Sequence, residues 1–159
     1  MVSQAQRINE LAASLERAYE HLTAKKMTQA ISSTLPPTTA NTFVKLSKLK
    51  TDKPVDHKRW LIGRLYMFAG SIYISCALAE IERNKHLNAQ QLCEHALQCL
   101  RSSIPHLPQW ERSSAIGYVA TLERTNQRLM SDKEYALIQL KALHLKVEKH
   151  ALFVPPEPR

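Results

Sequence analysis

The feature that most constrains this chain is a stretch of fifteen residues without a charge, 65–79, in the middle of a helix expected over about 57–84. A helix with so little polar surface must be surrounded by other helices or by lipid. A membrane span needs about twenty predominantly apolar residues, whereas this stretch is shorter and includes Gly70, Ser71 and Ser75. We therefore expect the central helix of a bundle, and no membrane span.

The rest of the chain also carries helical signals, and it has only three Gly, the residue on which all-β folds rely for tight turns. Apolar spacing predicts helices over about 4–32, 39–50, 57–84, 89–103, 109–130 and 132–150. The expected N-terminal caps are Thr39, Asp56, Asn88 and the box Ser131-Asp-Lys-Glu134. In the helix over 109–130, Ile116, Val119, Leu122 and Leu129 are expected in the core.

These signals predict an all-α fold, an antiparallel helical bundle of four long helices plus one short helix, with 57–84 at its centre. We expect a single all-helical domain over 1–154, with a basic connector at about 33–56 and a flexible tail at 155–159. The N-terminus has no apolar leader, and the three Cys fall on apolar helical faces, as reduced core thiols do. Both observations favour a cytoplasmic protein.

Residues 44–64, VKLSKLKTDKPVDHKRWLIGR, concentrate the positive charge. They hold seven Lys and Arg against two Asp, or +5 of the net charge of +8. The candidate binding residues are Lys45, Lys48, Lys50, Lys53, Lys58, Arg59 and Arg64. A basic balance favours nucleic acid, an anionic membrane or an acidic protein surface as the partner.

Two of these cations, Lys58 and Arg59, fall in the first turn of the helix over 57–84. The helix dipole disfavours cations there, whereas phosphate oxygens bind well at a helix N-terminus. Trp60 is either a core anchor or a surface on which an unpaired base stacks. No zinc finger or basic zipper accompanies the charge, so we expect little sequence specificity.

The leading hypothesis is a non-enzymatic accessory or adaptor protein whose basic segment contacts nucleic acid or a nucleoprotein complex. One alternative is a helical protein–protein interaction module, a homodimer or partner-binding adaptor, without nucleic-acid binding. The other is that the segment is a solvated connector with no partner.

Small residues recur on the central helix at Gly63, Gly70 and Ala77, seven positions apart. A glycine in a helix interior costs about 1 kcal/mol relative to alanine, so this helix-packing seam indicates a backbone that approaches closely. The close neighbour is either another helix of the same bundle or the same helix of a second copy.

Sequence patterns for catalysis or metal binding are sparse. The chain has no Gly-rich phosphate loop, HExxH, GxSxG or EF-hand motif. In CEHALQC, His95 and Cys99 share a helix face while Cys93 points elsewhere, and two ligands do not make a zinc site. We therefore expect no metal, no cofactor and no enzymatic activity.

One short motif supports a different class. The run Arg101-Ser-Ser-Ile-Pro-His106 is similar to the Arg-x4–6-His motif of HEPN-type ribonucleases, which are small all-helical dimers. The resemblance implies that Arg101 and His106 of facing protomers flank a scissile phosphate. Ser102 stands where that family usually has Asn, Asp or His, and Pro105 interrupts the helix. The alternative is a helix C-terminus that Arg101 stabilises, followed by a proline turn.

Overall fold

The computed structural model describes residues 1–158, and these residues form helices and connecting turns without a strand. The all-α prediction is confirmed. The elements are α1 (Val2–Arg17), η1 (Tyr19–His21), α2 (Ala24–Thr34), α3 (Pro37–Lys48), α4 (His57–Glu82), α5 (His86–Ser103), η2 (Ile104–His106), α6 (Gln109–Arg128) and α7 (Lys133–Ala151).

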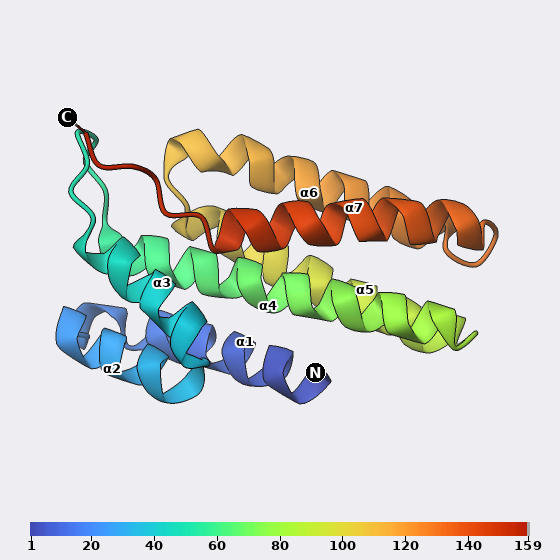
Figure 1. The fold of residues 1–159 in the computed structure, drawn as a ribbon, viewed down its shortest axis with the longest axis horizontal. Coiled ribbons are helices and arrows are strands. Elements are labelled where there is room, and N and C mark those ends of the chain that lie inside the picture. Colours follow the sequence, from blue (N-terminus) through green and yellow to red (C-terminus); the bar gives the residue numbers. More distant parts are fainter. Residues whose placement is uncertain (159) are drawn as a thin grey trace.

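Helix α4 lies at the centre of the fold, as predicted. It packs against α1, α3, α5 and α7, and Figure 1 shows it running through the middle of the molecule between α1 and α7. By length and hydropathy α4 would also suit a membrane span, but 89% of its most apolar window is buried inside the molecule. Neighbouring helices thus supply the apolar surroundings that its sequence requires.

The predicted bundle of four long helices and one short helix is not confirmed, because the described residues contain seven α-helices. The helix expected over 4–32 is broken: α1 ends at Arg17, and α2 begins after Thr23, whose hydroxyl accepts a hydrogen bond from the Lys26 amide. Half-buried Tyr19 and Leu22 continue the apolar spacing across the break, so periodicity alone does not show it. The antiparallel order of the long helices stays a prediction.

The predicted caps differ in outcome. Asp56 caps α4 by accepting hydrogen bonds from the Lys58 and Arg59 amides, as expected. Asn88 was the wrong cap, since α5 already begins at His86. Thr39 was also wrong, because Pro37 opens α3, a position where proline loses no hydrogen bond.

Helix α7 is capped one residue later than the Ser131 box predicts, since the Asp132 carboxylate accepts from the Tyr135 amide. Val119 and Leu122 in α6 and Leu129 directly after it are buried as expected. Ile116 is 55% exposed, so its place in the predicted core was wrong.

The predicted small-residue seam packs inside the chain, against α5 and η2. A Cβ atom added to Gly63 would lie 2.9 Å from Leu107 Cδ2, and one added to Gly70 would lie 3.3 Å from Leu100 Cδ2. Ala77 is fully buried. The seam is therefore occupied by the chain's own helices, and a homodimer, which stays a prediction, would need another surface.

The predicted connector at 33–56 is mostly structured. Helix α3 fills its centre and buries Ala40, Phe43 and Leu46. Only residues 49–56 link α3 to α4 without helix. After α7 the described residues form no further helix or strand, and Val154 packs against the core. The single domain over 1–154 and the flexible tail stay predictions, and residue 159 lies outside the described residues.

Candidate functional site: a basic end and a buried ionic cluster

The structure divides the seven predicted binding residues into three environments. Five of them are exposed on α3, on the 49–56 loop and at the start of α4, namely Lys45, Lys48, Lys50, Lys53 and Arg59. Lys58 is half-buried, and Arg64 is only 1% exposed. Arg64 therefore does not belong to a surface with the other six, and we remove it from the predicted contact surface.

Cations from a second part of the chain join the exposed five. The end of α1 and the start of α2 lie at the same end of the molecule as the end of α3 and the start of α4 (Figure 1). We call this the basic end and define it as segments 17–26 and 45–59. Together the segments hold nine Lys and Arg against three Asp and Glu. The sequence reasoning missed Arg17, Lys25 and Lys26, because only the fold brings them to the other cations.

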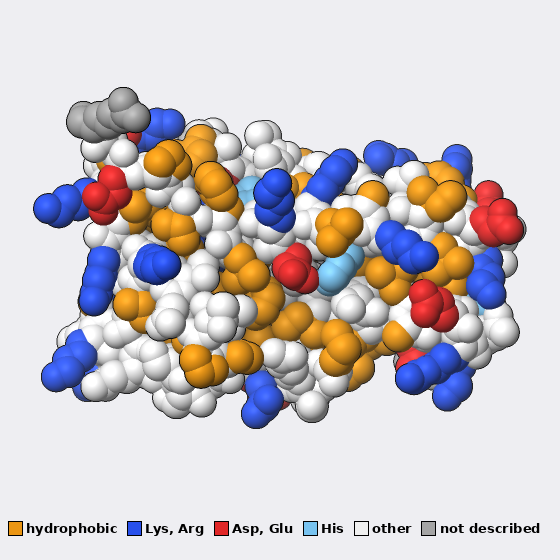
Figure 2. All heavy atoms as spheres, in the orientation of Figure 1, with side chains coloured by type: hydrophobic (Ala, Val, Ile, Leu, Met, Phe, Trp, Pro, Cys, Tyr) orange, Lys and Arg blue, Asp and Glu red, His pale blue; other side chains and the backbone are white. Residues whose placement is uncertain are grey.

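The visible face of the molecule shows the same asymmetry. In Figure 2, Lys and Arg side chains dominate the left end, where these segments lie, whereas acidic and basic side chains mix at the right end. Separated charges of one sign sum to a long-range field, while mixed charges largely cancel it. On this face the positive charge is therefore least offset by acids at the basic end.

Lys58 has a structural role at this end. Its Nζ donates hydrogen bonds to the carbonyl oxygens of Tyr19 and Leu22, both at 3.3 Å, and lies 4.5 Å from the centre of the Tyr19 ring. The Arg59 guanidinium lies 5.1 Å from the same ring. Carbonyl oxygens and an aromatic face thus offset the unfavourable position of two cations in the first turn of α4.

The aromatic surface at this end comes from Trp110 and not from Trp60. Trp60 is 1% exposed, which fits the core-anchor interpretation, whereas Trp110 is 40% exposed. Lys53 Nζ lies 4.8 Å from the centre of the Trp110 ring. Trp110 also lines a small pocket with the 49–53 loop and residues 155–158. A cation and an exposed indole thus lie side by side at the edge of the basic end.

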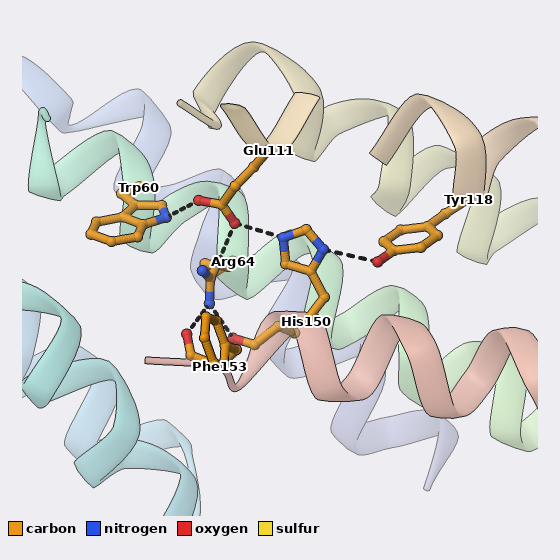
Figure 3. Close-up of polar contacts among 7 residues, drawn as sticks. Trp60, Arg64, Glu111, Tyr118, His150 and Phe153 are labelled. Carbon is orange, nitrogen blue, oxygen red and sulfur yellow. Dashed lines mark hydrogen bonds and ion pairs between the residues drawn. The ribbon is translucent and has the colours of Figure 1, made fainter. Parts of the chain in front are cut away.

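Arg64 belongs to a different feature, a buried ionic cluster of Trp60, Arg64, Glu111, Tyr118 and His150 (Figure 3). Arg64 Nε lies 2.9 Å from Glu111 Oε1, and both side chains are almost fully buried. The Trp60 indole N–H donates to the other carboxylate oxygen, Oε2. His150 Nε2 lies 2.6 Å from Glu111 Oε1.

The cluster fastens the C-terminal segment to the helices. Arg64 Nη1 donates to the carbonyl oxygens of Ala151, at 3.3 Å, and Phe153, at 2.6 Å. These carbonyls lie where α7 ends and would otherwise lack helical partners. Arg64 therefore links α4 to the end of α7 directly and to α6 through Glu111.

Electrostatics keep the central pair charged. Burial raises the pKa of the Glu111 carboxyl, but the hydrogen bond from His150 and the charge of Arg64 outweigh it and hold that pKa below its ordinary value. Burial lowers the pKa of the Arg64 guanidinium, and Glu111 opposes this shift. An arginine stays protonated in proteins, so the pair is an ion pair that the fold depends on.

Tyr118 completes the cluster at its outer side. Its hydroxyl lies 3.0 Å from His150 Nδ1. In a neutral imidazole the Nε2–H group donates to Glu111, and Nδ1 accepts from the Tyr118 hydroxyl. Hydroxyl, imidazole and carboxylate thus follow the order of a nucleophilic triad, but burial and the Glu111 charge raise the pKa of Tyr118. The phenol therefore stays protonated near neutral pH, and the arrangement suits binding better than nucleophilic attack.

The two residues of the ribonuclease-like motif have separate partners. His106 Nε2 lies 2.6 Å from Glu16 Oε1, and Tyr66 donates to the other Glu16 oxygen at 2.8 Å. Arg101 pairs instead with Glu123 on α6, at 2.9 Å. Burial raises the pKa of Glu16, but the contacts with His106 and Tyr66 outweigh burial and hold that pKa below its ordinary value. Each member of the motif is thus engaged with its own carboxylate.

The cysteines are reduced core residues, as predicted. Cys76, Cys93 and Cys99 are free and buried. Burial raises the pKa of both Cys93 and Cys99 to about 12, so neither is a thiolate at neutral pH. His95 is exposed and stacks on Tyr73. Within residues 1–158 no group of three or more His, Cys, Asp and Glu side chains is placed to hold a metal ion.

Comparisons with protein-family models, with curated proteins and with solved structures found no match to this chain. The functional argument therefore rests on the geometry of the basic end and of the ionic cluster.

Proposed function

We propose that this chain is a non-enzymatic accessory or adaptor protein whose basic end binds nucleic acid, or the nucleic acid of a nucleoprotein complex, with little sequence specificity. The observation that carries the proposal is the gathering of nine cations against three acids from two separate parts of the chain at one end of the molecule. Phosphate contacts of this kind supply affinity without reading sequence.

The side chains at the basic end support a backbone contact in particular. Five candidate cations are exposed, and they come from a helix, a loop and a helix start. The exposed Trp110 beside Lys53 adds a ring on which an unpaired base can stack. Single strands, whose bases are free to stack, should therefore bind at least as well as duplexes.

The experiment is a titration of fluorescently labelled single- and double-stranded oligonucleotides of mixed sequence between about 50 and 200 mM salt. The test variant reverses four exposed cations that have no structural hydrogen bond from the charged group: Lys48→Glu, Lys50→Glu, Lys53→Glu and Arg59→Glu. Lys58 is left intact because it holds the Tyr19 and Leu22 carbonyls. We expect salt-sensitive binding by the natural chain and its loss in the variant.

The matched control reverses four cations outside the basic end: Arg83→Glu and Lys85→Glu in the turn between α4 and α5, Arg128→Glu on α6 and Lys141→Glu on α7. Both variants change the net charge by the same amount, so any difference between them reports the position of the charge. If both variants lost binding equally, the net charge alone would explain the loss. That result would contradict a localised site.

A helical protein–protein interaction module is the second candidate. Ile138 and Leu145 on α7 are about two-thirds exposed, and they are seven residues apart, so they share a helix face. Apolar side chains placed in this way suit a partner helix. This candidate would be favoured if the chain retained a protein partner in a pull-down at high salt and the variant Ile138→Glu/Leu145→Glu did not. If the mass in solution is that of two chains, and the same variant lowers it to that of one chain, the face belongs to a homodimer.

A further inference from the structure

The ionic cluster forms one side of a pocket that shares only Trp110 with the proposed nucleic-acid contact. The pocket has a volume of about 400 Å³ and lies between α6, the end of α7 and the segment after it. It is lined by Arg64, Trp110, Glu111, Tyr118, Lys146, Lys149, His150, Phe153 and Pro155. Pockets that hold small organic molecules are typically of this size or somewhat larger, apolar in their walls, with a few fixed polar groups.

The walls are suited to an apolar body. Trp110, Tyr118, Phe153 and Pro155 contribute rings, and Lys146 and Lys149 contribute apolar side-chain stems. Phe153 is 51% exposed and Trp110 is 40% exposed, although both are large apolar side chains. A ligand in the pocket would cover surface that these two residues otherwise present to water.

The charges that line the pocket select an anion. Glu111 is its only acidic lining residue, and Arg64 neutralises it at 2.9 Å. Lys146 and Lys149 remain, and neither forms an ion pair within the described residues; the nearby Glu148 pairs with His144 instead. The lining thus carries two uncompensated positive charges beside an apolar cavity.

We propose that this pocket binds a small organic anion with an aromatic or aliphatic body, its carboxylate or sulfonate held by Lys146 and Lys149. The body packs between Trp110 and Phe153, and the Tyr118 hydroxyl, fixed by His150, supplies an oriented polar group on the pocket wall. The Glu111–Arg64 pair holds this wall in place from behind. Apart from Trp110, the residues that would hold this anion lie outside the basic end.

The test uses two fluorescent probes of nearly the same shape, anilinonaphthalene sulfonate and its uncharged parent phenylnaphthylamine. We expect saturable binding of the sulfonate at one site per chain, and weaker binding of the uncharged parent. Lys146→Gln/Lys149→Gln should weaken the sulfonate about tenfold, as loss of about 1.4 kcal/mol would, and leave the parent unchanged. Phe153→Ser should weaken the binding of both probes, because it removes an apolar wall of the pocket. The substitution keeps the backbone carbonyl of residue 153, to which Arg64 donates.

The matched control is Lys85→Gln/Lys141→Gln, which removes the same charge from exposed positions outside the pocket lining. An equal loss of sulfonate binding in this control would reduce the effect to net charge and overturn the proposal. So would the absence of saturable binding, or sulfonate binding that Lys146→Gln/Lys149→Gln does not change. A stoichiometry of one probe per two chains would assign the surface to a second copy and also overturn it. Oligonucleotide binding is measured separately, so either proposal can fail alone.

Discussion

Arg64 and Arg59 come from the same basic segment, five residues apart on the same helix, yet they have opposite environments. Arg59 is exposed beside other cations, whereas Arg64 is buried against Glu111 and two backbone carbonyls. A charge density counted along the sequence treats the two alike. The comparison shows that the direction of a side chain on α4 decides whether its charge faces solvent or supports the fold.

The largest expected effect is on the buried side. Glu111→Gln leaves Arg64 charged and buried without its counter-ion, which should lower the free energy of unfolding by about 3–5 kcal/mol. Glu123→Gln, which breaks the exposed pair with Arg101, should cost at most about 1 kcal/mol. Urea unfolding of both variants measures the difference, and similar values would mean that burial does not separate the two ion pairs.

The next effect concerns the glycine seam on the same helix. Gly70→Leu should destabilise the fold by about 1–3 kcal/mol or more, because its Cβ alone would reach 3.3 Å from Leu100. Gly117→Ala on α6 is the control, since no atom lies within 4 Å of the added Cβ. There the better helix propensity should stabilise the protein by up to about 1 kcal/mol. An unchanged melting temperature for Gly70→Leu would contradict the packing of α4 on α5.

The pH dependence should also separate the two regions. Glu111 has a folded-state pKa below its ordinary value of 4.5, so its ionised form stabilises the fold above that value. This stabilisation is lost as the pH falls through the folded-state pKa. The unfolding free energy should therefore decrease below about pH 4.5, and Glu111→Gln should flatten that decrease. A pH profile unchanged by this substitution would contradict the assigned role of Glu111.

The smallest stability effect is expected at the basic end. Reversal of Lys48, Lys50, Lys53 and Arg59 should change the unfolding free energy by only about 0.5 kcal/mol per site, because these side chains are exposed. Circular dichroism and urea unfolding provide the check. A much larger loss of stability would show that these cations support the fold, as Lys58 does.

The sequence was sufficient for the helical class, for α4 as the central helix and for Asp56 as its cap, because these follow from local spacing. It was not sufficient for the break after Arg17, where the apolar spacing continues through Tyr19 and Leu22. Seven positive charges could be counted, but the burial of Arg64 depends on Glu111, which is 47 residues away in sequence. His150 and the cations of 17–26 join their sites in the same way, through the fold alone.

The most direct test of the contact surface is the dependence of oligonucleotide affinity on salt. If all five exposed cations contact a single strand, a plot of log K against log salt should have a slope of about −3.5, and fewer contacts give a shallower slope. The double variant Arg64→Met/Glu111→Leu, which replaces the buried ion pair with uncharged side chains, should keep this slope. The four-site reversal should lose it. No binding at about 50 mM salt, or equal slopes in the natural chain and the reversal variant, would contradict the proposal that the basic end binds nucleic acid.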